Sequence, residues 1–256
     1  MKKSELNRDV RPRAVRACVL CGGYGTRLRA VLADRPKSMA LISGTPFLEL
    51  LLDRLRSQGI DDVILGTGYM ADRVESYFGS GDKHSMRICY SREDKPLGTG
   101  GALKLAEPLI SDPVLVLNGD SYVEWSLVPM LELFTGRDAR LVMVLQAVAD
   151  VSRYGSVALD QESRVMQFVE KGAASGPGLI NAGVYLLRKQ IVRDLPADTA
   201  ISLEREVFPR LLDRGVYGLI STGTFIDIGI PEDFKRAQTL LASRVNAASQ
   251  NSVADV

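Results

Sequence analysis

The sequence predicts an α/β fold in which helices cover both faces of a parallel β-sheet. Short apolar runs, typical of buried parallel strands, alternate with helical segments through the first half of the chain. Strands that alternate with helices form a parallel sheet because each helix carries the chain back to the start of the next strand. The 256 residues are ample for a sizeable hydrophobic core.

The first half contains the clearest elements. The apolar run 15–21 (VRACVLC) predicts a buried strand, and further strands are expected at 62–66, 86–90 and 113–118. Helices are expected at 45–58, 70–78 and 99–110. Thr45 is expected to cap the first of these helices, with Pro46 in its first position and Gly59 at its end.

The second half is more mixed. Strands are expected at 140–148, 156–159, 165–169, 183–187, 216–220 and 225–228. A helix broken at Pro209 is expected over 201–213, and a final helix begins at Pro231. We expect one continuous domain over residues 15–242, between an N-terminal tail (1–14) and a C-terminal tail (243–256).

Composition excludes several classes of partner. Lys and Arg number 32 against 31 Asp and Glu, so net charge gives no indication of nucleic acid or an anionic membrane. No apolar stretch approaches the length of a membrane span. The three cysteines are sparse and odd in number, which predicts reduced thiols in a cytoplasm. Cys18 and Cys21 are expected to face opposite sides of a strand, which favours core residues over a metal site.

The first strand leaves through a glycine-rich turn that is followed by cations. Gly22, Gly23 and Gly25 allow the backbone to approach a phosphate and turn its amides toward it. Arg27 and Lys37 follow, and together they suit a polyphosphate. A tight turn with solvated cations is the alternative interpretation of each part taken alone.

Two aspartates are expected at strand ends. Asp120 follows the apolar run VLVLN, and Asp227 lies in TFIDIGIPED. Carboxylates in such positions hold a divalent ion such as Mg²⁺, which also takes phosphate oxygens and water as ligands. The alternative for Asp120 is a simple turn, which Asn118-Gly119 also favours.

This set of motifs resembles the sugar-1-phosphate nucleotidyltransferases, also called nucleotide-sugar pyrophosphorylases. The matching pieces, in family order, are LCGGYGTRL, RPK, PLGTGGAL, LNGD, YGSV, FVEK, NAGVY and FIDIGIPEDF, spread over residues 15–242. Within the family the chain looks most similar to bacterial D-glycero-α-D-manno-heptose 1-phosphate guanylyltransferases. The resemblance implies a Rossmann-like three-layer αβα sandwich with a mixed, mostly parallel central sheet, and Mg²⁺ at the site.

The resemblance also implies residue roles. Catalytic roles fall to Arg27, Lys37 and Lys171, and Mg²⁺ would be held by Asp120 and Asp227. The nucleoside triphosphate, with GTP expected, would contact Leu20, Gly22, Gly23, Gly25, Thr26, Gly98 and Thr99. The sugar 1-phosphate would contact Asn118, Gly155, Glu170 and Asn181.

The implied reaction gives GDP-heptose and pyrophosphate in the cytoplasm, for capsule, S-layer or lipopolysaccharide sugars. A phosphate oxygen of the sugar 1-phosphate attacks the α-phosphorus of GTP, and no general base is needed because the nucleophile is already an anion. Three alternatives stay open: a uridylyl- or thymidylyltransferase acting on a hexose 1-phosphate, a glycosyltransferase, and a non-catalytic regulator that binds nucleotide sugars. The sequence also leaves open whether the chain forms a homo-oligomer.

Overall fold

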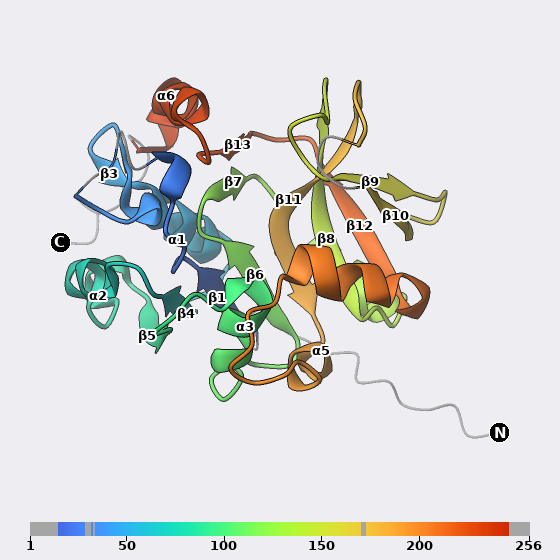
Figure 1. The fold of residues 1–256 in the computed structure, drawn as a ribbon, viewed down its shortest axis with the longest axis horizontal. Helices are drawn as coiled ribbons and strands as arrows, with labels where there is room; N and C mark the ends of the chain where they lie inside the picture. The colour runs from blue at the N-terminus through green and yellow to red at the C-terminus, as the bar shows by residue number, and fades with distance from the viewer. Residues whose placement is uncertain (1–14, 29–31, 33, 170–172, 246–256) are drawn as a thin grey trace.

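The computed structural model describes residues 15–28, 32, 34–169 and 173–245 (Figure 1). Within this part, nine strands form the main sheet. Four of them come from the first half: β1 (Arg16–Leu20), β4 (Asp62–Thr67), β5 (Arg87–Arg92) and β6 (Val114–Asn118). Their order is β5-β4-β1-β6, and all three pairings are parallel, as the alternation of strands and helices predicts.

The second half extends the sheet with antiparallel strands. The long strand β11 (Gly178–Leu187) pairs antiparallel with β6 and also with β8 (Leu141–Val148) and β9 (Ser156–Leu159). Two outer strands complete it: β10 (Val165–Val169) pairs with β9, and β12 (Val216–Ser221) runs parallel to β8. The predicted α/β class with a mixed central sheet is confirmed.

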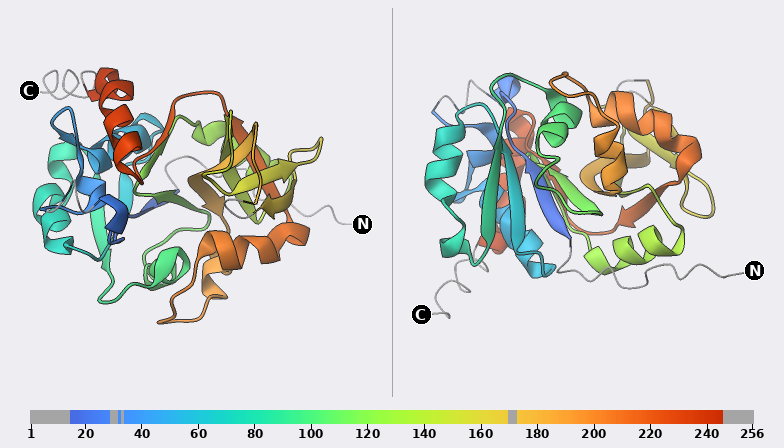
Figure 2. Two further views of the ribbon diagram at one scale, coloured as in Figure 1. Left: turned by 45° about the horizontal axis from the view of Figure 1, so that its top comes forward. Right: turned by 90° about the horizontal axis from the view of Figure 1, so that it is seen from below.

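Helices cover both faces of this sheet (Figure 2). One core contains Val19 and Leu117 and is closed by α1 (Phe47–Ser57), α2 (Ala71–Phe78), α4 (Leu127–Gly136) and α6 (Pro231–Leu240). The other core contains Cys18 and Val116, which point the opposite way along the same strands. It is closed by α3 (Gly98–Leu105), α5 (Lys189–Arg193), the π-helical turn η5 (Leu203–Val207) and the 3₁₀ helix η6 (Phe208–Arg214).

One helix expectation needs correction. Thr45 caps no helix, because Thr45–Pro46 form a short strand, β3, that pairs with β2 (Leu41–Ile42). Pro46 is extended, with ψ of 137°, so α1 begins only at Phe47. The segment expected as a helix broken at Pro209 does change helix type there: η5 is followed by η6, which begins one residue before Pro209.

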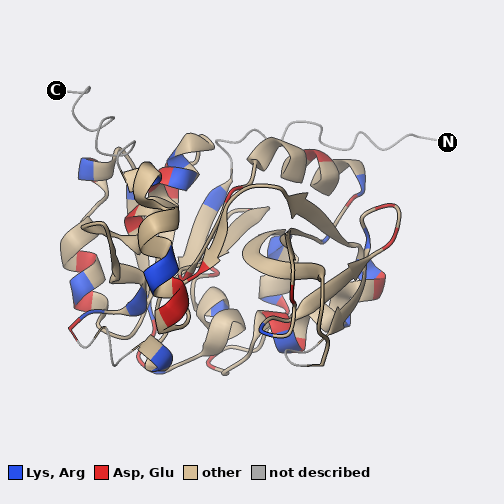
Figure 3. Ribbon diagram, turned by 90° about the horizontal axis from the view of Figure 1, so that it is seen from above, with Lys and Arg blue, Asp and Glu red and all other residues tan. Residues whose placement is uncertain are grey.

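The remaining short elements lie around the sheet. They are η2 (Thr26–Leu28), η3 (Lys37–Met39), η4 (Asp82–His84) and the separate strand pair β7 (Ser121–Val123) and β13 (Phe225–Asp227). Cys18 and Cys21 do lie in opposite cores, as expected, and both are free thiols. Figure 3 shows cationic and anionic positions interspersed over the described chain. No described helix is long and apolar enough to cross a bilayer.

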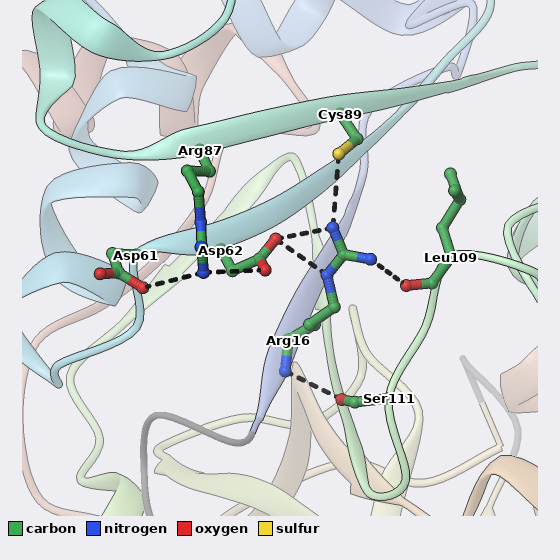
Figure 4. Close-up of polar contacts among 7 residues, drawn as sticks. All are labelled: Arg16, Asp61, Asp62, Arg87, Cys89, Leu109 and Ser111. Atoms are coloured by element: carbon green, nitrogen blue, oxygen red, sulfur yellow. Dashed lines mark hydrogen bonds and ion pairs between the residues drawn. The ribbon is translucent and has the colours of Figure 1, made fainter.

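A polar cluster joins the amino ends of the parallel strands (Figure 4). Arg16 donates from Nε to Asp62 Oδ1 at 2.8 Å, and its Nη2 lies 3.3 Å from Cys89 Sγ. It also donates to the Leu109 carbonyl oxygen. Arg87 pairs with the second oxygen of Asp62 at 3.1 Å. The cluster therefore fastens β1 to β4, β5 and the segment after α3, at the opposite edge of the sheet from the loops described next.

Candidate active site

The carboxyl ends of the parallel strands place the predicted motifs side by side. Leu20, the last residue of β1, is in register with Asn118 of β6 and with Gly66 of β4. The glycine turn after β1 and the Gly119-Asp120 turn after β6 therefore leave the sheet next to each other. Ligands of open α/β sheets bind in the crevice outside these strand ends.

A first pocket, of about 400 Å³, opens at this edge. It is lined by every residue predicted to contact the nucleotide and by both predicted phosphate-binding cations: Leu20, Gly22, Gly23, Gly25, Thr26, Arg27, Lys37, Gly98 and Thr99. Arg27 lies on η2 and is exposed, whereas Lys37 lies on η3 with a largely buried side chain. The sequence motifs and the pocket therefore coincide.

Two glycines are required by the geometry of this pocket. Gly25 has φ of +56°, and a Cβ there would lie 2.9 Å from Lys37 Cβ. Gly98, the first residue of α3, has φ of +66°, and a Cβ there would lie 2.6 Å from the Ile201 carbonyl oxygen. Any side chain at either position would therefore combine backbone strain with a clash.

A second pocket, of about 550 Å³, adjoins the first and shares Asn118 and Asp120 with it. It contains the predicted sugar residues Asn118, Gly155 and Asn181. The remaining predicted residues, Glu170 and Lys171, lie outside the described residues. A reactant in the second pocket would thus meet a phosphate chain in the first at the position of Asp120.

The two aspartates converge on one ammonium at this junction. The pairing of β13 with β7 sets Asp227 opposite Ser121, and the Ile228 amide donates to the Asp120 carbonyl oxygen at 3.0 Å. Lys37 Nζ lies 2.6 Å from Asp120 Oδ2 and 3.8 Å from Asp227 Oδ1. Burial and the negative charge of Asp120 raise the pKa of Asp227, while Lys37 lowers it.

This geometry fits a divalent cation. Two carboxylates already share one positive charge, and both belong to the junction between the pockets. Among the described residues, no cluster of three or more His, Cys, Asp or Glu side chains could hold a metal unaided. A bound Mg²⁺ would therefore need substrate phosphate oxygens and water to complete its coordination.

Several polar residues of the pockets escaped the sequence analysis. Glu93, just after β5, lines the first pocket, and its Oε2 accepts from the Leu97 amide at 3.1 Å. Burial raises the pKa of Glu93. Glu204 of η5 and Tyr185 of β11 line the second pocket. Glu93 and Glu204 sit in charged segments, REDK and LEREV, which are typical of solvated surface.

Comparisons with known proteins point to one family. A family model described as "Nucleotidyl transferase" matches residues 16–244. The chain is 42% identical to a D-glycero-α-D-manno-heptose 1-phosphate guanylyltransferase of Aneurinibacillus thermoaerophilus, over 87% of this chain and 96% of that protein. It is 39% identical to a mannose-1-phosphate guanylyltransferase of Mycobacterium tuberculosis, over 87% of this chain and 63% of that protein.

Solved structures show the same fold. The crystal structure of HddC from Yersinia pseudotuberculosis superposes with a TM-score of 0.77 at 37% identity, covering 88% of this chain and 98% of that one. The same protein complexed with GMP-PN superposes with a TM-score of 0.76 over the same shares of the two chains. The Rossmann-like three-layer architecture that the resemblance implies is confirmed.

Proposed function

The chain belongs to the nucleotidyl transferase family, and we propose that it transfers GMP from GTP to D-glycero-α-D-manno-heptose 1-phosphate. The products would be GDP-heptose and pyrophosphate. The membership confirms the expected enzyme class. The observation that carries the proposal is the junction at which Lys37, Asp120 and Asp227 lie between a glycine-lined pocket and a second polar pocket.

The residues of the first pocket suit a triphosphate. The turn 22–26 offers backbone amides, and Arg27 and Lys37 add two positive charges. When bound at Asp120 and Asp227, Mg²⁺ would neutralise phosphate charge. Lys37 would then hold the phosphate chain near the junction while a sugar phosphate oxygen from the second pocket approaches the α-phosphorus in line with the leaving pyrophosphate. Lys171, outside the described residues, is proposed to position the attacking phosphate.

Glu93 favours GTP over pyrimidine nucleotides. No described residue donates a hydrogen bond to Glu93 Oε1, so a carboxylate that can only accept faces the nucleotide pocket. Guanine offers two adjacent donors, N1–H and N2–H, which match the two oxygens of a carboxylate. Uracil and thymine offer one N–H between two carbonyl oxygens, which a carboxylate repels. Similarity to guanylyltransferases supports the same choice.

Heptose 1-phosphate is proposed on similarity alone. Relatives of that name include the Aneurinibacillus protein and one of Campylobacter jejuni, 38% identical over 97% of its length. Mannose 1-phosphate is the second candidate because the Mycobacterium protein is nearly as similar. Asn118, Asn181 and Gly155 suit sugar hydroxyl recognition, and they do not distinguish six carbons from seven.

A substrate panel tests the proposal. The full chain is incubated with Mg²⁺, one of GTP, ATP, UTP or dTTP, and one of heptose, mannose or glucose 1-phosphate, and pyrophosphate is measured. We expect the highest kcat/KM with GTP and heptose 1-phosphate. Preference for mannose 1-phosphate would change the sugar alone. Product from UTP or dTTP with glucose 1-phosphate, without product from GTP, would overturn the proposal.

A further inference from the structure

One carboxylate reaches donors from both pockets. Glu204, in the π-helical turn η5, is half-buried between α3 and β11. Its Oε2 accepts from the hydroxyls of Thr99 at 2.7 Å and Ser202 at 3.1 Å. Its Oε1 accepts from the Tyr185 hydroxyl at 3.1 Å and has a longer contact of 3.5 Å with Asn118 Nδ2. Four donors therefore surround a group with about four acceptor sites, and little capacity is left for a substrate hydroxyl.

On the nucleotide side, this carboxylate fixes the direction of one hydroxyl. Thr99 gives its only hydroxyl proton to Glu204, and its oxygen accepts from the Leu203 amide at 2.9 Å. Backbone bonds reinforce the attachment, because Ile201 accepts from the Gly100 amide at 2.8 Å and donates to the Leu97 carbonyl oxygen at 2.9 Å. The first turn of α3, which borders the first pocket, is thereby tied to η5.

On the sugar side, Glu204 fixes a chain of two more groups. The fully buried Tyr185 donates to Glu204, so its oxygen accepts from Asn181 Nδ2 at 2.8 Å. The Asn181 Oδ1 then accepts from the Gly183 amide at 3.0 Å. Burial and the negative charge of Glu204 hold the pKa of Tyr185 well above its ordinary value, so Tyr185 stays a donor at neutral pH. The orientation of Asn181, a predicted sugar residue, therefore depends on Glu204.

We propose that Glu204 is a positioning residue that couples the nucleotide and sugar pockets through Thr99 on one side and Tyr185–Asn181 on the other. The inference rests on the proposed function, since it assigns one substrate to each pocket. A substrate that orders its own side of the network also orders the carboxylate on which the other side depends. Each substrate is then expected to tighten binding of the other by the same factor, because coupling between sites is reciprocal.

The variant Glu204→Gln removes one of the two acceptor oxygens while keeping the size of the side chain. The amide has one acceptor oxygen, so the donors on one side of the network lose their partner. A matched control is Glu206→Gln in the same helical turn. Among the residues that the structure describes, Glu206 accepts from the Ser202 amide alone, at 2.9 Å through Oε1, which glutamine can still do. Tyr185→Phe tests the network from the sugar side with Glu204 left charged.

The experiment measures binding without turnover. The probe is the α,β-methylene analogue of GTP, whose α–β bridge cannot be cleaved as pyrophosphate leaves, titrated by calorimetry with and without saturating heptose 1-phosphate in Mg²⁺. We expect the sugar phosphate to lower the analogue Kd on the order of fivefold in the wild type and in Glu206→Gln. In Glu204→Gln and Tyr185→Phe the ratio is expected to fall close to one, with melting curves still cooperative.

The outcomes distinguish the coupling through Glu204 from the proposed function. A wild-type chain that binds both ligands with a ratio of one, or a Glu204→Gln variant that keeps the wild-type ratio, overturns the coupling and leaves the proposed function intact. Loss of thermal stability in Glu204→Gln without change in the ratio shows a purely structural brace and also overturns it. Failure of the wild type to bind either ligand overturns the proposed function and the coupling with it.

Discussion

Replacing Lys37 by methionine removes the positive charge at the junction of the two pockets. The side chain is only 10% exposed, and its ammonium lies between Asp120 and Asp227. At about 4 Å, two unit charges interact with roughly 4 kcal/mol at an effective dielectric constant of 20. Because the Asp120 side chain is 42% exposed, solvent screening reduces this to about 1 kcal/mol. We therefore expect a melting temperature about 2–4 °C lower in EDTA.

The loss of stability in Lys37→Met is expected to depend on pH. The pKa of Asp227 is raised overall, although the charge of Lys37 lowers it in part. Removing Lys37 therefore raises the pKa of Asp227 further. An acid with a raised folded-state pKa favours folding at pH values below its ordinary pKa, and this contribution is lost as pH rises. The deficit of Lys37→Met is thus expected to grow as pH rises above 3.8, the ordinary pKa of an aspartate, and through the raised pKa of Asp227. Added Mg²⁺ is expected to restore stability by pairing the two carboxylates.

The kcat of Lys37→Met is expected to fall strongly, although its stability falls only slightly. Loss of one preorganised group that stabilises transition-state charge lowers kcat by on the order of 10²- to 10³-fold. The assay is pyrophosphate release with saturating substrates. Lys104→Met is the control, because Lys104 is 17% exposed and pairs with Glu107 at 2.7 Å near the far end of α3. A kcat for Lys37→Met within threefold of the Lys104→Met value would refute the role of Lys37.

Three further changes test separate parts of the account. Glu93→Gln is expected to raise the KM for GTP roughly 10- to 100-fold, in line with loss of a bidentate base contact. In the wild type, the KM for GTP is expected to rise as pH falls through the pKa of Glu93, which lies above the ordinary 4.5. A wild-type KM that does not change with pH would contradict this role. Gly25→Ala is expected to lower kcat about 100-fold by displacing Lys37. The control Gly79→Ala, at a similar φ of +52° with open space around it, is expected to leave kcat unchanged. An equal loss of kcat in both variants would point to backbone strain alone. Arg16→Met is expected to lower the unfolding free energy by about 2 kcal/mol in urea with kcat intact, and a tenfold loss of kcat would be inconsistent with its place at the opposite sheet edge.

The sequence predicted the first pocket well because its signals are local. A glycine turn after an apolar strand and an aspartate after another are each visible within a few residues, and parallel strands bring their carboxyl ends together. Helix α1 was less well predicted. Threonine is a favoured residue at a helix N-cap, which is why Thr45 was expected there. Ser43 and Gly44 both have positive φ, however, and they turn the chain into a short hairpin before α1 begins.

The second pocket depends on long-range contacts that no local pattern contains. Glu204 meets Thr99 across 105 positions and Asn118 across 86, and it lies in a π-helical turn that the pattern of the segment does not reveal. The convergence of Asp120 and Asp227 likewise depends on the pairing of β7 with β13. The sequence indicated that Asp227 follows a strand, and the resemblance to a known family implied that it joins Asp120 at one metal site.

The most direct test of the central claim follows the α-phosphorus. The full chain is incubated with GTP labelled at the α-phosphate and with heptose 1-phosphate in Mg²⁺, and the products are separated. We predict that the label enters the nucleotide sugar, with one unlabelled pyrophosphate released for each labelled product, and that Lys37→Met slows both on the order of 10²-fold or more. Labelled GDP with inorganic phosphate, or labelled GMP without nucleotide sugar, would contradict the assignment of the two pockets to a triphosphate and an attacking sugar phosphate.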